Sequence, residues 1–314
     1  MKIAPSKIRL EASTICQLKC PSCSNGKGLI ASRLGSKFLK FEDFKKIINS
    51  NSWVRCIELS SWGEIFLNPD LLKIAQYAYK KKVILNAENG VNLNTISAKM
   101  LEGVVKWQFN HMTCSIDGAS NQTYRIYRKG GDFEKVMANI RKINEFKERY
   151  QSALPQLRWQ FIAFGHNAHE IPKARQMARK LGMDFYVKLA CDDFSPVKNK
   201  KLLNAFLGNG VGSREEYQKK YGKIYLAEDI CSQLWLDPQI NCDGRVLGCC
   251  VNYWGDYGNA FQKDLTGLLN NEKMNYARAM LLGKKEQRED IPCAQCGWYK
   301  EMKKSNTWLF SRRE

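Results

Sequence analysis

Hydrophobic and polar positions along the first 190 residues alternate between two periods. Short stretches with the two-residue period of a β-strand lie at 7–12, 54–59, 83–87, 112–116, 157–164 and 185–189. Stretches with helical spacing lie between them, at 41–50, 69–82, 97–106, 121–127, 133–150 and 170–181. In the second of these, Asn68 is the expected N-cap and Pro69 the first helical residue.

Six strands, each followed by a helix or crossover, predict a parallel α/β sheet curled into a partial (β/α)6 barrel. In such folds the functional site lies at the carboxyl ends of the strands. We therefore expect residues 1–190 to form one barrel domain with its site at that edge.

The pattern changes after residue 190. Residues 191–230 predict a bridging segment with one weak helix, residues 231–300 a small second domain, and residues 301–314 a basic tail. Six of the twelve cysteines lie between positions 231 and 296. Within this part, Asp243-Gly244 predicts the tight turn of a β-hairpin.

The twelve cysteines among 314 residues are too dilute for a disulfide-stapled scaffold. No apolar run approaches the roughly 18 residues that cross a bilayer, and the N-terminal residues have no signal-peptide core. We expect a cytoplasmic protein with no membrane partner. In that compartment thiols stay reduced, so abundant cysteine indicates metal binding or catalysis.

The chain carries 50 Lys+Arg and 31 Asp+Glu, a net charge of +19. This favours an anionic partner such as nucleic acid, a phosphorylated small molecule, an acidic peptide or a membrane surface. A solubilising coat of lysines explains the same charge. Aromatic residues do not alternate with basic ones as an RNA-stacking surface would require, so nucleic acid stays without support.

Directly after the first predicted strand, Cys16, Cys20 and Cys23 have the spacing C-x3-C-x2-C. Three thiolates on one loop can hold three irons of a [4Fe–4S] cluster and leave the fourth iron open to a substrate. A zinc site would instead favour paired C-x2-C units and four protein ligands.

This loop resembles that of the radical S-adenosylmethionine (radical SAM) family, whose partial (β/α)6 barrel carries it after the first strand. The resemblance implies that the open iron binds the amino and carboxylate groups of SAM. One departure is Ser22, where the family usually has an aromatic residue beside the adenine.

Further motifs at the strand ends resemble those of the same family, although Trp62 replaces the first glycine of its GGE motif. The resemblance implies that Glu64 receives the ammonium of SAM, that Arg128 pairs with its carboxylate and that Gln160 faces its ribose. The expected SAM-binding residues are Gly63, Glu64, Ser115, Arg128 and Gln160.

The C-terminal cysteines resemble the SPASM extension of this family, which houses auxiliary iron–sulfur clusters. Cys231 and Cys249 fit its C-x12-G-x4-C opening, and Cys293 with Cys296 would complete four ligands. Because no cysteine follows Cys296, the truncated single-cluster form called Twitch fits better. Cys250 could replace Cys249 as a ligand.

The resemblance implies reductive cleavage of SAM to a 5′-deoxyadenosyl radical, with an electron from a reductant such as flavodoxin or ferredoxin. The first hypothesis is an oxidoreductase or epimerase acting on a sugar, cyclitol or nucleotide-linked sugar. Epimerisation needs a hydrogen donor, for which Cys250 and Cys242 are the candidates. Polar residues expected in strand-end loops could bind hydroxyls or act as a base: Glu88, His166 and Asp193.

Two alternatives stay open. A peptide or protein maturase would epimerise, crosslink or oxidise a precursor; the start of the barrel almost at residue 1 leaves no leader-recognition domain and argues against it. A non-enzymatic cluster-binding or sensor protein would have no need of Glu64 together with Arg128.

Overall fold

A single eight-stranded sheet runs through the molecule. The structure is a computed structural model that describes residues 2–192, 194–208 and 210–310. The strand order is β6-β5-β4-β3-β2-β1-β7-β8, with β1 to β6 parallel. The strands are β1 (Lys7–Leu10), β2 (Cys56–Glu58), β3 (Ile84–Val91), β4 (His111–Ser115), β5 (Gln156–Ala163), β6 (Asp184–Leu189), β7 (Gln239–Ile240) and β8 (Val246–Gly248).

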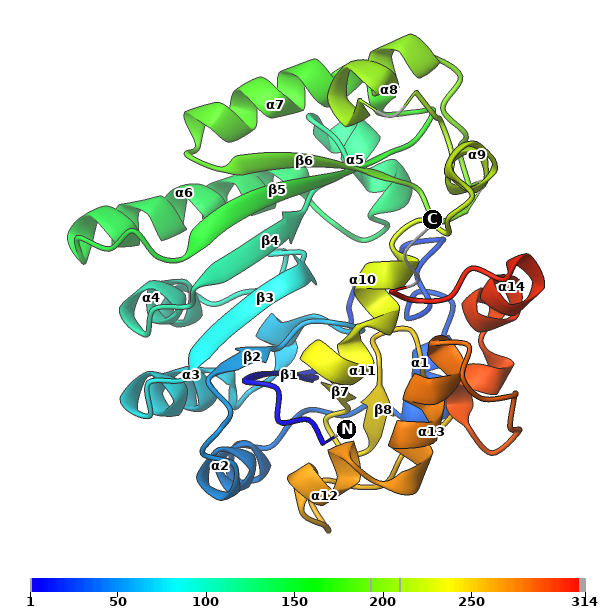
Figure 1. Cartoon of the computed structure of the whole chain (residues 1–314). Coiled ribbons are helices and arrows are strands. Elements are labelled where there is room, and N and C mark those ends of the chain that lie inside the picture. Colours follow the sequence, from blue (N-terminus) through cyan, green and yellow to red (C-terminus); the bar gives the residue numbers. More distant parts are fainter. Residues whose placement is uncertain (1, 193, 209, 311–314) are drawn as a thin grey trace.

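Helices cover the outer side of the parallel part and place its strand ends at one edge (Figure 1). The elements up to β6 are α1 (Leu29–Leu34), α2 (Phe41–Ser50), η1 (Ile65–Leu67), α3 (Leu71–Lys80), α4 (Ala98–Lys106), α5 (Asn121–Tyr127), α6 (Phe133–Arg149), η2 (Ala168–Glu170) and α7 (Ile171–Lys180). This arrangement confirms the predicted (β/α)6 partial barrel.

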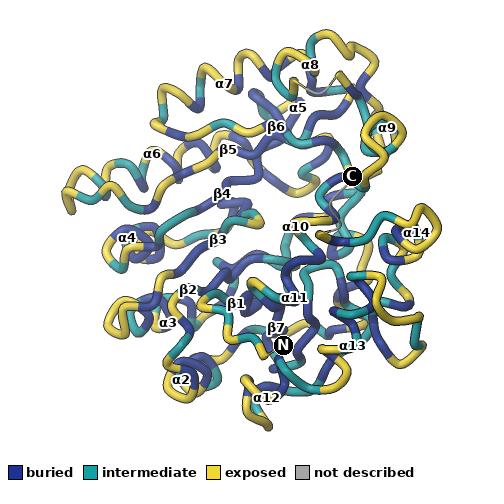
Figure 2. Tube along the Cα trace, viewed as in Figure 1, coloured by how far each residue is buried: buried dark blue, intermediate teal, exposed yellow. Residues whose placement is uncertain are grey.

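The strand alternation separates an apolar outer face from a polar inner face. Ile57, Val187 and Leu189 are buried in the main core under the helices. Their neighbours Glu58 and Lys188 point to the opposite side, because successive side chains of a strand alternate. Figure 2 shows the strands buried and the outward sides of the helices exposed.

The third helix of the chain begins later than predicted. It starts at Leu71 with Asp70 as N-cap, so the assignment of Asn68 and Pro69 to its first turn is wrong. Asn68 serves other partners: its Nδ2 donates to the carbonyls of Ala12 and Leu39, each at 2.9 Å, and its Oδ1 accepts from the Asp70 amide at 2.8 Å. The side chain thus ties the cysteine loop to α3 instead of capping it.

The described residues of the segment after β6 form three helices, where one weak helix was predicted. They are α8 (Lys200–Leu207), α9 (Arg214–Tyr221) and α10 (Ala227–Cys231). Helix α8 buries only Leu203, and α9 buries no residue. The sequence of α9 therefore carries little of the apolar periodicity on which helix prediction depends, whereas α8 packs Leu203, Phe206 and Leu207 on or against the core.

The C-terminal part extends the sheet. β7 pairs in parallel with β1 and antiparallel with β8, and the predicted hairpin turn at Asp243-Gly244 joins the two. Gly244 has φ +87°, a conformation that glycine adopts without a steric cost. The remaining elements are α11 (Gln233–Leu236), α12 (Leu265–Leu269), α13 (Glu272–Leu281), η3 (Pro292–Gln295) and α14 (Gly297–Ser305).

One hydrophobic core includes residues of both parts, for example Ile8 of β1, Ile240 of β7 and Met280 of α13. None of the described helices has the length and apolar character needed to span a bilayer.

We expect a chain ending at residue 230 to aggregate, because it leaves the β1 edge unpaired and exposes core that the C-terminal part covers. The soluble fraction and the size-exclusion profile of the expressed protein measure this. A chain ending at residue 310 is the control and should stay soluble. A monomeric 1–230 chain with a cooperative thermal transition would contradict the expectation.

Candidate functional site

The loop between β1 and α1 carries the first three cysteines. Cys20 is buried, and Cys16 and Cys23 are half-buried. Two donors approach the sulfurs: Arg128 Nη1 lies 3.8 Å from Cys20 Sγ, and Asn92 Nδ2 lies 3.7 Å from Cys16 Sγ. Burial raises the pKa of the Cys16 thiol to about 12, so bound iron would have to displace its proton.

Apolar and aromatic side chains enclose this loop from the side of β5. Cys20 packs with Leu18, Tyr127 and Phe164, and the two rings lie 4.4 Å apart. Such a shell limits solvent access and, with donors to the sulfurs, tunes the potential of an iron–sulfur cluster. Among the described residues, no three His, Cys, Asp or Glu side chains gather tightly enough for a single metal ion.

Ser22, the departure from the family pattern, contacts the segment after β6. Its Oγ donates to Asp192 Oδ1 at 2.6 Å, and Lys27 Nζ lies 3.7 Å from the other carboxylate oxygen. The residue thus holds residues 191 and 192 against the cysteine loop.

The turn after β2 fits closely against the same loop. A Cβ at Gly63 would lie 2.3 Å from the Ser13 carbonyl oxygen and 2.6 Å from that of Ile15. Glu64 follows; its carboxylate accepts from the amides of Phe66 at 3.2 Å and Asn92 at 2.6 Å. Burial raises the pKa of Glu64 to about 7.

Glu11 is a site residue that the motifs did not reveal. Its buried carboxylate accepts from the Trp62 amide at 3.2 Å and the Gly63 amide at 3.4 Å, and burial raises its pKa to about 8. It therefore holds the Gly63 turn in place. Its position immediately after the first strand was the available signal.

The other predicted SAM contacts lie on β4, β5 and the end of α5. Ser115 and Gln160 are paired neighbours on adjacent strands, and both are buried. Arg128 donates through Nε to Asp117 Oδ2 at 2.6 Å, and Asp117 accepts the Ile162 amide at 2.7 Å. Asp117 thus orients Arg128 toward Cys20.

A second cysteine group lines one pocket under the C-terminal helices. The remaining lining is mostly apolar, and Tyr257 Oη lies 3.6 Å from Cys293 Sγ. The four cysteines of this pocket are Cys231, Cys249, Cys293 and Cys296.

Cys250 and Cys242, the two candidate hydrogen donors, do not line this pocket. Cys250 Sγ accepts from Gln233 Nε2 at 3.5 Å, while Gln233 Oε1 accepts the Cys250 amide at 2.8 Å. The charged groups that act on its thiol include Arg9 and Lys188, both on the inner face, and burial raises the pKa of that thiol. Cys242 is buried beside Glu11.

The candidate polar residues divide between strand and loop. Glu88 lies inside β3, which runs on to Val91, and not in a loop as predicted; Lys7 Nζ is 2.8 Å from its Oε2. His166 stacks on Phe164 with ring centroids 5.4 Å apart. Among the described residues, neither of its buried ring nitrogens has a hydrogen-bond partner, and burial lowers its pKa. Asp193 lies outside the described residues.

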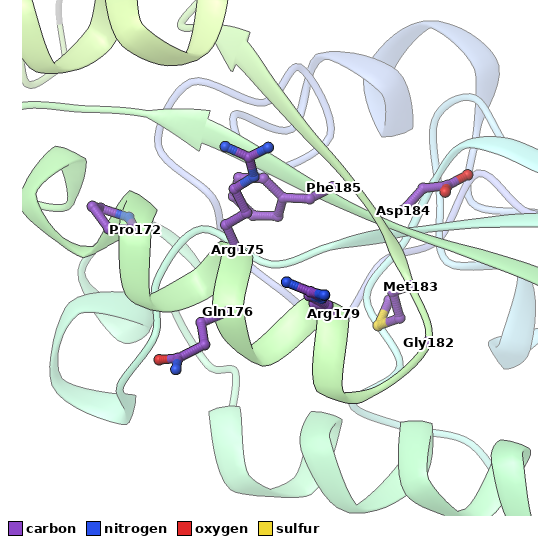
Figure 3. A pocket seen from close by; sticks show the side chains of 8 residues that line it. All are labelled: Pro172, Arg175, Gln176, Arg179, Gly182, Met183, Asp184 and Phe185. Atoms are coloured by element: carbon purple, nitrogen blue, oxygen red, sulfur yellow. The ribbon is translucent and has the colours of Figure 1, made fainter.

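An open hollow of about 710 Å³ lies between α7 and β6 (Figure 3). It is lined by Arg175, Arg179 and Met183 at the amino end of β6, opposite the strand ends that carry the cysteines. The hollow is therefore separate from the candidate site.

Comparison with known proteins identifies the two parts. The model of the radical SAM superfamily matches residues 10–150, and that of the SPASM iron–sulfur cluster-binding domain matches residues 231–297. The chain belongs to the radical SAM superfamily. It is a radical SAM enzyme with a C-terminal SPASM domain, and these two domains imply [4Fe–4S] clusters and SAM as cofactors.

Similar proteins act in different ways. The chain is 23% identical over 221 residues to a probable GTP 3′,8-cyclase of Methanocaldococcus jannaschii, covering 69% of this chain and 67% of that one. SuiB of Streptococcus suis bound to S-adenosylmethionine superposes with a TM-score of 0.65 at 14% identity, over 94% of this chain and 71% of SuiB. Another SuiB structure holds the precursor peptide SuiA.

BtrN in complex with AdoMet and 2-DOIA superposes with a TM-score of 0.53 at 14% identity, over 95% of this chain and 94% of BtrN. At such identities the likeness of both structures is one of fold.

We expect Gly63→Ala to lose the iron of the first cluster and keep the second, because its Cβ would push against the backbone of the cysteine loop. Iron per chain, after anaerobic reconstitution, should fall from about eight to about four. Gly212→Ala is the control, since the nearest atom to its Cβ would be 3.5 Å away. Full iron content in Gly63→Ala would contradict this expectation and show that the cysteine loop can shift to accommodate the Cβ.

Proposed function

We propose that this radical SAM enzyme epimerises a carbon of a small polar substrate, of the sugar, cyclitol or nucleotide-linked sugar class. The observation that carries the proposal is the place of Cys250. Its sulfur is not part of the lining of the four-cysteine pocket and accepts a hydrogen bond from Gln233 Nε2 at 3.5 Å, and the charges of Arg9 and Lys188 on the barrel's inner face act on its ionisation. An epimerase needs a hydrogen donor on one side of its substrate, and a thiol supplies it.

The proposal assigns Cys16, Cys20 and Cys23 to the SAM-binding [4Fe–4S] cluster. It assigns the pocket cysteines to one auxiliary cluster, the Twitch arrangement: Cys231, Cys249, Cys293 and Cys296. Two independent groups of cysteines with donors or apolar walls around them support this division. Gln233 supports Cys249 as the ligand in preference to Cys250, since it holds the Cys250 sulfur by a hydrogen bond.

Glu64, Arg128, Ser115 and Gln160 are proposed to hold SAM at the carboxyl ends of the strands, around Gly63. Glu64 suits the ammonium of SAM. Its buried carboxylate accepts hydrogen bonds from two backbone amides and has further lone pairs free to accept from the ammonium. Arg128 keeps donors beyond its bond to Asp117, so it suits the carboxylate. When loaded, the site supplies reductive SAM cleavage to methionine and a 5′-deoxyadenosyl radical.

The hydrogen transfers that follow involve the substrate and Cys250. One hydrogen atom leaves a substrate C–H bond and forms a C–H bond of 5′-deoxyadenosine. Cys250 gives its S–H hydrogen to the opposite face of the substrate carbon, which inverts it. The thiyl radical left on Cys250 takes one electron from a reductant of the flavodoxin or ferredoxin class and one proton.

Other inner-face residues are proposed to hold hydroxyl groups of the substrate. Glu58 and Glu88 lie in neighbouring strands, and the Glu88 amide donates to Glu58 Oε2 at 2.8 Å. Glu88 is one-third exposed on its side chain and paired with Lys7. It can accept a hydroxyl, and it would be the base if the reaction were a dehydrogenation.

Peptide maturation is the second candidate. Its support is the fold shared with SuiB, one structure of which holds a precursor peptide. In that case Cys250 would give its hydrogen to the α-carbon of a residue in the bound peptide.

We expect Cys20→Ala to lose the ability to form 5′-deoxyadenosine from SAM and dithionite, because the first cluster loses one of three ligands. The measurement is 5′-deoxyadenosine by liquid chromatography, with iron counted in the same sample. The wild type should hold about seven to eight irons. Cys114→Ala is the matched control, since this buried thiol packs in the main core. Unchanged 5′-deoxyadenosine in Cys20→Ala would refute the proposed site.

We expect Cys250→Ala to keep SAM cleavage and iron content and to lose the inverted product. The assay presents a panel of nucleotide-linked sugars in D₂O, where the wild type should place one deuterium on the inverted carbon. Cys242→Ala is the control, because that thiol is buried beside Glu11. Loss of iron in Cys250→Ala would make Cys250 a ligand, and retained inversion would remove it as the donor.

A further inference from the structure

The inner face of β6 holds a lysine with no partner. Lys188 lies between Val187 and Leu189, which are buried in the main core, so its side chain projects to the inner side with that of Tyr186. It is half-buried. In the part of the chain that the structure describes, its ammonium has no ion pair and no hydrogen bond, although buried charges in proteins are generally paired.

A second cation lies next to it. Arg214, the first residue of α9, donates through Nε and Nη2 to the Leu189 carbonyl at 3.4 Å and 3.3 Å. Its guanidinium stacks over Tyr225, 5.1 Å from the ring centroid. Within the described ranges it has no carboxylate partner either.

The acidic residues nearest in sequence to Arg214 are committed elsewhere. Glu215 pairs with Lys219 at 2.9 Å, and Glu216 pairs with Lys200 at 2.7 Å. Asp117 interacts with Lys188 but is bonded to Arg128. Among the residues that the structure describes, neither cation of this pair therefore has a carboxylate of its own.

The other end of the inner face is different. Arg9 pairs with Asp237 at 3.1 Å and Lys7 with Glu88 at 2.8 Å, so every cation there has a carboxylate. The inner face thus has a neutralised side on β1 to β3 and a cationic side on β6. Burial lowers the pKa of Lys188, and the charge of Arg214 lowers it further. A bound anion would relieve that repulsion.

We propose that Lys188 and Arg214 bind a phosphoryl group of the substrate. The inference rests on the proposed function and narrows its substrate class to phosphorylated small molecules, nucleotide-linked sugars included. A phosphate monoester carries a charge of about −1.5 to −2 at pH 7, which two adjacent cations match and a single carboxylate does not. The Tyr186 and Tyr225 hydroxyls, 3.5 Å apart, offer further donors beside them.

The position of Lys188 and Arg214 is also compatible with the proposed hydrogen donation by Cys250. The charge of Lys188 and the ionisation of Cys250, the proposed hydrogen donor, influence each other, so both side chains lie on the inner side of the sheet. A phosphoryl group held on β6 would leave the rest of the substrate to extend across the inner face, past Cys250, toward the carboxylates of β2 and β3. One anchored end limits the positions from which a carbon can meet the thiol.

The test is anaerobic calorimetric titration of the cluster-loaded protein with inorganic pyrophosphate, inorganic phosphate and acetate at constant ionic strength. We expect pyrophosphate and phosphate to bind and acetate not to. Lys188→Met and Arg214→Met should each weaken pyrophosphate binding about tenfold or more, the loss of one charge-assisted contact. Arg214→Lys should keep more affinity than Arg214→Met.

Lys201→Met, which removes an exposed charge on α8, is the matched control and should bind as the wild type does. The proposal is overturned if the wild type binds no phosphate, if Lys201→Met weakens binding as much as Lys188→Met, or if acetate binds as tightly as phosphate. The last result would favour a carboxylate ligand such as an acidic peptide.

Formation of 5′-deoxyadenosine by the wild type distinguishes a failure of the phosphoryl site from a failure of the proposed function. If 5′-deoxyadenosine forms while phosphate binding is absent or insensitive to Lys188, the phosphoryl site is refuted and the radical SAM site is retained. If it does not form, the proposed function fails, whatever the titration gives.

Discussion

Strand β1 is hydrogen-bonded along both edges, to β2 on one side and to β7 on the other. The first cysteine group follows its carboxyl end, and β7 leads into the hairpin that carries Cys249 and Cys250. The position of one cysteine group relative to the other is therefore fixed by backbone pairing within a single sheet. A flexible linker between two separate domains could not set it so closely.

The same strand places two charged residues whose burial needs explanation. Arg9 projects to the inner face and is neutralised by Asp237, which lies just before β7. Glu11, beyond the strand end, is fully buried, and its carboxylate accepts hydrogen bonds from the backbone amides of the Gly63 turn. Both residues join the barrel to its C-terminal extension or its cysteine loop, so their cost in desolvation is offset by contacts that define the site.

Charge on the inner face is distributed unevenly, and this distribution connects the proposals. Carboxylates and their paired cations occupy the side of β1 to β3, while Lys188 and Arg214, on the side of β6, pair with no carboxylate in the described part of the chain. Cys250 lies between them, held by Gln233 and acted on by Arg9 and Lys188. A substrate with hydroxyls at one end and a phosphoryl group at the other would meet complementary groups along this face. The net charge of +19 adds only a long-range attraction for such an anion.

The sequence by itself determined the strands of the barrel, the cysteine loop and the hairpin turn, because alternation, loop spacing and Asp-Gly are local signals. It gave one weak helix where α8, α9 and α10 lie, because α9 buries no apolar residue, and it misplaced the start of α3, where Asn68 bonds to Ala12 and Leu39. Only the tertiary structure decided that β7 pairs with β1, that the Cys250 sulfur accepts a hydrogen bond from Gln233 and that Arg214 donates to the Leu189 carbonyl beside Lys188. These are contacts between residues far apart in the chain, and their geometry depends on packing that no local pattern encodes.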